Sequence, residues 1–163
     1  MIGAMNQKVR KCVKCYGACE TKILASVSGE APPLKLTAHG MPALVCAKDH
    51  HAPVHRDFMI WLIQELRARE AQFVAGKEQG MIFKKHLCGD CGKELAPKPE
   101  RRQAFPFDLA YAETPPFKVE IEMPLYKCTG CGKEQIRSAK DLHNHIPPAM
   151  VEINDAAGFP HSG

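Results

Sequence analysis

Hydrophobic and polar residues alternate along two short segments, one in each half of the chain. Residues 117–123 place Phe, Val, Ile and Met at every second position, with Lys and Glu between them. Residues 34–39 repeat the pattern more weakly, with Leu and Ala alternating with Lys, Thr and His. A period of two is typical of a strand with one buried and one solvated face. We expect residues 21–27 to form a partner strand, turning through residues 28–30 to complete a hairpin.

Helical spacing follows each of these segments. Apolar residues at intervals of three or four form one face after the first: Met59, Leu62, Ile63, Leu66 and Phe73. They predict an amphipathic helix that ends near Gly76. After the second, Ser138 precedes Asp141 by three positions, which resembles a capping box. Pro147-Pro148 then either starts a fresh helix or breaks this one.

The first predicted helix opens with a run of apolar residues from Phe58 to Ile63. This run is apolar all round, which is wider than the single stripe that a core-facing helix needs. Two interpretations stay open. The run is either buried between the two halves of the chain, or it forms a docking surface for a protein partner or a second copy of the chain.

Residues 96–116 interrupt the alternating pattern of the second half. They contain five prolines and the charged run of Lys98, Glu100, Arg101 and Arg102. This composition predicts an inserted extended arm or loop on the surface.

Cysteines mark four corners of the chain. Cys12 and Cys15 open the first half and Cys46 closes it, whereas Cys88 and Cys91 open the second half and Cys128 and Cys131 close it. Both pairs of the second half continue as Gly-Lys, and the glycine permits a tight turn that aims backbone N–H groups at the sulfurs. Four thiolates suit tetrahedral zinc, and four protein ligands form a closed structural site. The same ligands would also suit iron in a rubredoxin-like carrier.

The first half has three thiolates and needs a fourth ligand. His50 is the preferred choice, because three thiolates and one imidazole form a standard structural zinc shell. His51 and Cys19 remain open as alternatives, and His55 is a more distant one. The chain is therefore expected to hold two zinc ions.

The same features occur in the same order in both halves: a cysteine pair, Pro-Pro, an alternating strand, Met-Pro, a closing cysteine corner and a helix. This order predicts an α+β fold made by tandem duplication of a small zinc-ribbon β-hairpin unit, each copy followed by an α-helix. Residues 1–80 would form the first repeat. Residues 81–163 would form the second, with the Pro-rich insertion at 96–116 and a C-terminal helix.

Two patterns carry a resemblance to a known family. They are Cys12-x-x-Cys15 with Met41-Pro42-Ala43-x-x-Cys46, and Cys88-x-x-Cys91-Gly92 with Met123-Pro124-x-x-x-Cys128-x-x-Cys131-Gly132. Each resembles the YgiT-type zinc-finger domain, the N-terminal, toxin-binding part of MqsA-like antitoxins. The resemblance covers the ribbon of each half and implies a metal-binding role for the seven cysteines. It does not extend to the helix-turn-helix domain that reads DNA in that family, so it does not imply the antitoxin function.

Charge and composition add little to this picture. Zinc sites with charges of −2 and −1 bring the formal net charge of +4 to about +1, which gives weak support for phosphate binding. The sequence shows no signal-peptide pattern and no apolar run of membrane-spanning length. We therefore expect a cytoplasmic protein with reduced thiols.

These observations favour a non-enzymatic double zinc-ribbon protein, an adaptor or accessory subunit that docks on a protein partner through Phe58–Ile63. Closed metal shells and the lack of a phosphate loop or nucleophile motif argue against an enzyme. One alternative is a nucleic-acid-binding regulator with the ribbon edges and Lys98, Arg101 and Arg102 on the phosphates. The other is a redox or metal-handling protein that uses Cys19 or an exchangeable first site.

Overall fold

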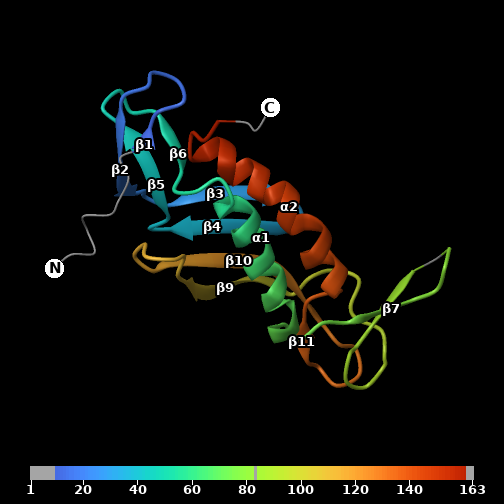
Figure 1. Ribbon diagram of the computed structural model, residues 1–163. Coiled ribbons are helices and arrows are strands. Elements are labelled where there is room, and N and C mark those ends of the chain that lie inside the picture. Colours follow the sequence, from blue (N-terminus) through green and yellow to red (C-terminus); the bar gives the residue numbers. More distant parts are fainter. Residues whose placement is uncertain (1–9, 83, 161–163) are drawn as a thin grey trace.

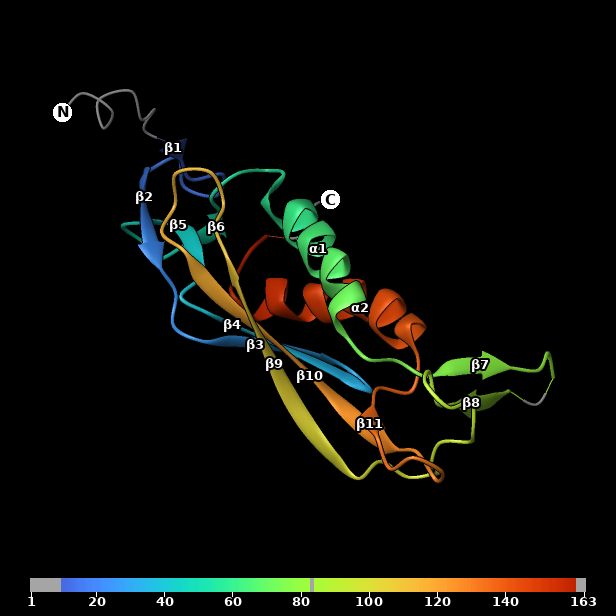
Figure 2. The same cartoon turned by 90° about the horizontal axis from the view of Figure 1, so that it is seen from below.

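The computed structural model describes residues 10–82 and 84–160, which form strands and two helices around a central sheet (Figures 1 and 2). In chain order the elements are β1 (Arg10–Lys11), β2 (Ala18–Ile23), β3 (Val27–Ala31), β4 (Leu34–His39), β5 (Pro42–Cys46), β6 (His51–Pro53), α1 (Phe58–Ala68), a 3₁₀ turn (Arg69–Gln72), β7 (Lys77–Gln79), β8 (Lys85–Leu87), β9 (Arg101–Leu109), β10 (Phe117–Lys127), β11 (Glu134–Gln135) and α2 (Ala139–Ala156). The predicted α+β class is confirmed, and the tandem duplication stays a prediction.

The central sheet joins strands from both halves of the chain. β10 pairs antiparallel with β4, with Ile121 opposite Leu36, and β9 and β3 extend the sheet at its two sides. Side chains along β10 alternate, with Phe117, Val119 and Ile121 buried. The strand predicted from the alternating pattern is therefore confirmed, and its apolar face lies in the main core.

The first hairpin differs from the prediction. Residues 21–27 do not form one strand, because β2 pairs with β5 whereas β3 pairs with β4. The turn between β3 and β4 lies at Pro32-Pro33 instead of at residues 28–30. Gly29 is buried within β3, where an added Cβ would collide with the carbonyl oxygen of Ala149 in α2. This glycine serves the close approach of a helix, a role that a glycine within a strand often has.

Both helices cover one face of the central sheet, as Figure 2 shows. α2 packs on β3 and β4, and α1 packs beside α2. Within Phe58–Ile63, Phe58 and Leu62 are fully buried, whereas the Ile60 side chain is 59% exposed. Trp61 is half-buried, with its ring centroid 4.9 Å from that of Tyr111. One side of this apolar run therefore belongs to the core and the other faces solvent.

α1 is shorter than predicted. The helix ends at Ala68, and after the 3₁₀ turn the backbone of Phe73 is extended, with φ −91° and ψ 138°. The Phe73 ring packs against Phe105 and Phe107 of β9, at centroid distances of 4.7 and 5.9 Å. The prediction that the helix continues to Gly76 is wrong because Phe73, although it fits the helical spacing, covers the sheet from an extended segment.

α2 begins at the predicted cap but forms one helix where a break was predicted. The Ser138 hydroxyl accepts the backbone N–H of Lys140 at 3.0 Å. The Asp141 carboxylate contacts Arg137 at 3.3 Å instead of completing a reciprocal capping box. The helix then runs through Pro147-Pro148 without interruption. The expectation of a break or a fresh helix at these prolines is therefore wrong.

The insertion at 96–116 contains a regular strand rather than only an arm or loop. β9 pairs with β10 along its whole length, with Phe105 opposite Ile121 and Pro106 opposite Glu120. Within the described chain β9 pairs with no second strand, so Pro106 lies at a sheet edge, where proline is tolerated. The alternation of Phe105 and Phe107 with exposed residues explains why this proline-containing segment forms a strand.

Two smaller sheets lie at opposite ends of the molecule in Figure 1. β1, β2, β5 and β6 form one of them, and the β7–β8 hairpin forms the other near β11. Each end carries one group of cysteines. Neither helix of the described chain has the combination of length and apolar character that crossing a membrane requires.

Candidate metal centres

The structure brings eight predicted ligands together in two groups of four. One group is Cys12, Cys15, Cys46 and His50, and the other is Cys88, Cys91, Cys128 and Cys131. Within each group the potential ligand atoms all lie within 4.8 Å of one another. Both groups alternate between buried and more exposed members, so each lies at the surface with one side covered by protein.

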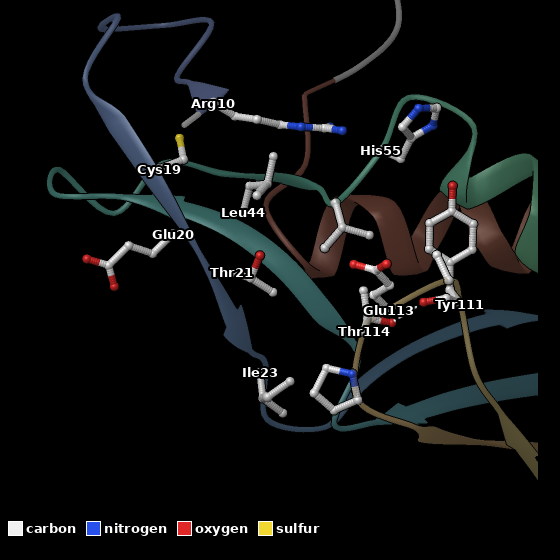
Figure 3. Close-up of a pocket in the computed structure, with 13 residues that line it drawn as sticks. Arg10, Cys19, Glu20, Thr21, Ile23, Leu44, His55, Tyr111, Glu113 and Thr114 are labelled. Carbon is white, nitrogen blue, oxygen red and sulfur yellow. Dashed lines mark hydrogen bonds between the residues drawn. The ribbon is translucent and has the colours of Figure 1, made fainter. Parts of the chain in front are cut away.

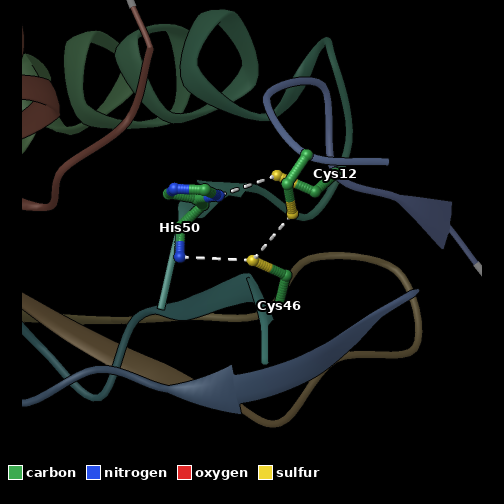
Figure 4. A group of neighbouring side chains, drawn as sticks. Cys12, Cys46 and His50 are labelled. Atoms are coloured by element: carbon green, nitrogen blue, oxygen red, sulfur yellow. Dashed lines mark hydrogen bonds between the residues drawn. The ribbon is translucent and has the colours of Figure 1, made fainter. Parts of the chain in front are cut away.

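The first group is held by the turn after β1 and by the turn after β5. Figure 4 shows Cys12, Cys46 and His50 pointing toward one another. The His50 Nδ1 lies 3.3 Å from the Cys12 Sγ, and the Cys15 Sγ lies 3.8 Å from the Cys46 Sγ. Backbone N–H groups of Lys14 and His50 donate to the sulfurs of Cys12 and Cys46, each at 3.4 Å. These donors favour the thiolate form.

Three of the four cysteine corners form the same turn. The residue four positions after the first cysteine donates its N–H to that cysteine's carbonyl oxygen and has a left-handed backbone. These residues are Tyr16 (φ 60°), Gly92 (φ 78°) and Gly132 (φ 77°). Glycine takes this conformation without strain, which explains the Gly that follows both C-x-x-C pairs of the second half.

The corner at Cys46 is one residue shorter. Here the left-handed residue is Asp49 (φ 62°), and its N–H donates to the Cys46 carbonyl oxygen at 2.9 Å. Asp49 therefore matches Gly132 of the other group and not Cys131. The shortened turn has no position for a second thiol, and the side chain of the next residue, His50, completes the group.

The alternatives to His50 lie outside the first group. His51 points to α2, where its Nδ1 lies 2.9 Å from the Ala157 carbonyl oxygen, and its Nε2 contacts Asp49 at 3.0 Å. Cys19 lies opposite Cys46 in the β2–β5 ladder, and its Sγ lies 3.9 Å from the Gly17 carbonyl oxygen. His55 contacts Asp57 at 3.6 Å. Among these histidines and cysteines only His50 joins the three thiols.

The second group links the turn after β8 to the turn after β10. The Cys88 and Cys131 sulfurs lie 3.7 Å apart, and those of Cys91 and Cys128 lie 3.3 Å apart. The N–H groups of Asp90 and Gly130 donate to the sulfurs of Cys88 and Cys128 at 3.4 and 3.3 Å. This repeats the donor pattern of the first group.

Gln135 is a residue of the second site that the sequence did not indicate. Its side chain is buried, its Nε2 donates to the Cys88 Sγ at 3.3 Å, and its Oε1 accepts the Gly89 N–H at 2.9 Å. A second contact joins the two turns, from the Lys133 Nζ to the Asp90 Oδ2 at 2.6 Å. The Lys that follows Cys-Gly was visible in the sequence, but Gln135 carries no motif that could have revealed it.

Backbone and side-chain donors lower the pKa of Cys12 in the first group and of Cys88 and Cys128 in the second. Burial has the largest effect on Cys12 and raises its pKa, but the N–H groups of Cys15 and Lys14 and the His50 ring together lower it to about 6. At Cys88 the Cys91 N–H has the largest effect, followed by the Gln135 amide, and the pKa falls to about 6. Cys12 and Cys88 are therefore thiolates near neutral pH.

The crowded sulfurs oppose ionisation of one further thiol in each group, Cys15 and Cys131. The Lys133 N–H lowers the pKa of Cys131, but burial and the neighbouring thiols outweigh it and raise the pKa to about 11. The pKa of Cys15 is also raised, because burial and the neighbouring thiols outweigh the effect of the Gly17 backbone. A cation at the centre of each group would remove this repulsion, since metal binding and thiol ionisation are coupled.

The spacing of the donors fits zinc. A tetrahedral ion with zinc–sulfur bonds of about 2.3 Å places neighbouring sulfurs about 3.8 Å apart. The observed sulfur distances of 3.8, 3.7 and 3.3 Å lie at or slightly below this value. Three thiols with one imidazole, and four thiols, are both established structural zinc sets.

Comparison of the chain with protein-family models, with curated proteins and with solved structures finds no match. The resemblance to YgiT-type zinc fingers therefore stays a prediction from the cysteine patterns. The functional argument rests on the geometry of the two groups.

Proposed function

We propose that this chain is a non-enzymatic double zinc protein whose two ions are structural and which acts as a protein-interaction adaptor or accessory subunit. The observation that carries the zinc assignment is the convergence of four ligand atoms within 4.8 Å at each end of the molecule. Four protein donors fill a tetrahedral shell and leave no position for a substrate, as is typical of structural zinc.

The end of the molecule that carries the second group has a physical need for such an ion. Around the second group, the described residues form a buried apolar cluster of only Cys88, Leu95 and Cys128, with Tyr126 packed against it. So small a cluster removes little apolar surface from water and cannot by itself offset the entropy of ordering the surrounding turns. Four metal–ligand bonds would link these turns to β10 and supply the missing order.

The zinc assignment is tested by measuring the metal content of the purified protein together with its circular dichroism spectrum. We expect two equivalents of zinc, and loss of the ordered ends when a strong chelator removes the metal. A folded protein with fewer than two equivalents would contradict the assignment. Iron in the second group, visible as thiolate-to-iron absorption, would instead support a rubredoxin-like electron carrier.

The adaptor role is supported by the solvent-facing side of α1. Ile60 is 59% exposed and lies between the half-buried residues Met59 and Trp61. Trp61 packs against the core rings of Phe58, Tyr111 and Phe117, so it is unsuitable as a test of docking. Ile60 is the better probe, because its substitution leaves the core intact.

We expect Ile60→Asp to abolish docking, whether on a protein partner or on a second copy of the chain. Val151→Asp on α2 is the matched control, since Val151 is 58% exposed and also helical. Light scattering reports self-association and pull-down reports a partner, while zinc content shows that both variants are folded. If Ile60→Asp changes neither self-association nor partner binding, this face of α1 is not the docking surface.

A further inference from the structure

A groove runs beside the first metal group. It consists of two cavities, of about 260 Å³ and about 940 Å³. Both are lined by Arg10, Cys19, Leu44 and His55, so they lie side by side, and we refer to them together as the groove. Figure 3 shows the Arg10 side chain reaching across the larger cavity toward His55.

The smaller cavity is cationic. Four cationic side chains line it, from Arg10, Lys11, Lys14 and Arg56, beside the thiols of Cys12 and Cys19 and the His50 ring of the first metal group. No carboxylate is among the described residues that line it. Among those residues Arg10, Lys11 and Lys14 make no side-chain ion pair or hydrogen bond, and Asp57 lies 3.9 Å from Arg56. The cavity therefore offers several basic side chains to an anion.

The larger cavity has a different character. Tyr111, Thr21 and Thr114 line it together with two carboxylates, Glu20 and Glu113. Tyr111 supplies an aromatic face, and its ring is fixed by Phe58 at a centroid distance of 5.1 Å and an angle of 83°. The carboxylates repel a second anion but accept hydrogen bonds from amino groups. This cavity suits a neutral, planar group that carries hydrogen-bond donors.

We infer that the groove binds a nucleotide unit, with its phosphate in the cationic cavity and its base against Tyr111. A nucleotide has an anionic phosphate and a neutral planar base, which match the cationic cavity and the larger cavity in turn. Stacking of bases on aromatic side chains and attraction of phosphates to basic side chains are the usual means of binding single strands. Lys98, Arg101 and Arg102 line neither cavity, so they take no part in this site.

The position of His55 supports this assignment. Its Nδ1 accepts the backbone N–H of Asp57 at 3.1 Å. The neutral ring therefore carries its proton on Nε2, which leaves that atom as a donor. Because His55 lines both cavities, it can donate to a ligand at the point where the phosphate and the base meet.

The test uses the full-length, zinc-loaded protein and a fluorescein-labelled single-stranded oligonucleotide of about 12 nucleotides. We expect Arg10→Gln/Arg56→Gln to weaken binding about tenfold at moderate salt, and to reduce the slope of log K against log salt by about 1.4, or about 0.7 for each lost phosphate contact. Lys98→Gln/Lys118→Gln is the matched control. It also removes two exposed positive charges, but on the β9–β10 side, and should change the affinity less than twofold.

A second pair of variants tests the base. Tyr111→Leu should weaken binding at least fivefold, because stacking is lost, whereas Tyr111→Phe should retain it. Because the Tyr111 ring also packs against Phe58 and Trp61, the unfolding midpoint of both variants is measured to separate lost binding from lost stability. Competition with adenosine monophosphate and with unlabelled strand shows whether a free nucleotide or a polymer is the better source of this chemistry. Equal loss in the control and groove variants, or equal competition by polyglutamate, would overturn the inference. Zinc content remains at two equivalents throughout if only the groove is affected.

Discussion

Arg67 of α1 donates two hydrogen bonds to the backbone carbonyl oxygen of His143 in α2, from Nη2 at 2.9 Å and from Nε at 3.3 Å. In an uninterrupted α-helix this carbonyl would accept the N–H of residue 147. Pro147 has no N–H, so the carbonyl lacks its helical partner. The guanidinium group replaces that partner and so offsets the hydrogen bond that α2 loses at Pro147.

This replacement predicts an energetic coupling between the two helices. Arg67→Met should reduce the free energy of unfolding by about 1.5 kcal/mol, the lower end of the range for hydrogen bonds to charged groups, because this contact is exposed. In a Pro147→Ala background the His143 carbonyl regains its helical partner, so Arg67→Met should reduce the free energy of unfolding clearly less. Denaturant unfolding of the four proteins of this double-mutant cycle measures the difference. Equal costs in both backgrounds would show that Arg67 does not compensate for Pro147.

Gln135 predicts a second effect, on metal affinity. Gln135→Leu removes the donor to the Cys88 Sγ and the acceptor of the Gly89 N–H, although it preserves the buried volume. Loss of such a supporting hydrogen bond typically lowers metal affinity by about 10–100-fold. We therefore expect the second site to release zinc more readily in competition with a chromogenic chelator.

Lys133→Gln provides the control for Gln135. It breaks the exposed contact to Asp90 but leaves the sulfur donors in place. Its effect on zinc release should be small, because exposed ion pairs contribute little. If both variants release zinc at the wild-type rate, the Gln135 amide has no influence on the metal.

The cysteine corners could be predicted from the sequence because their geometry is local. A C-x-x-C turn with a left-handed residue after it is determined by a few neighbouring residues, as at Cys88 and Gly92. His50 could also be predicted from the sequence as the fourth ligand, but the structural reason for it could not. The turn at Asp49 is one residue shorter, and only the backbone hydrogen bonds show this.

The errors arose where distant segments decide the local structure. Phe73 leaves the helical pattern to cover Phe105, which lies in a segment expected to be an arm or a loop. Pro147-Pro148 is accommodated by a side chain from another helix. Gly29 serves the packing of α2 and not a turn. None of these partners is near in sequence, so local patterns could not reveal them.

The lowered thiol pKa values predict how zinc is lost in acid. The pKa of Cys12 and of Cys88 is lowered from 9.0 to about 6, so their thiolates persist above that pH and are lost as the pH falls through it. Because protons compete with the metal for the same sulfurs, both sites should keep zinc at neutral pH and release it below about pH 6. Zinc released to a chromogenic indicator during acid titration measures this. Release of half of the zinc above pH 7 would show that the hydrogen-bond donors to Cys12 and Cys88 do not stabilise the thiolates.

The identity of the fourth ligand at the first site gives the most direct test. His50→Ala should reduce the zinc content from two equivalents to one, because the remaining three thiols leave the shell open. His50→Cys should restore the second equivalent if the thiol can reach from the shortened turn. His51→Ala and Cys19→Ser should each retain two equivalents, since neither side chain joins the group. Loss of one equivalent in either of these variants, with His50→Ala unaffected, would assign the ligand to the other residue and contradict the placement of His50.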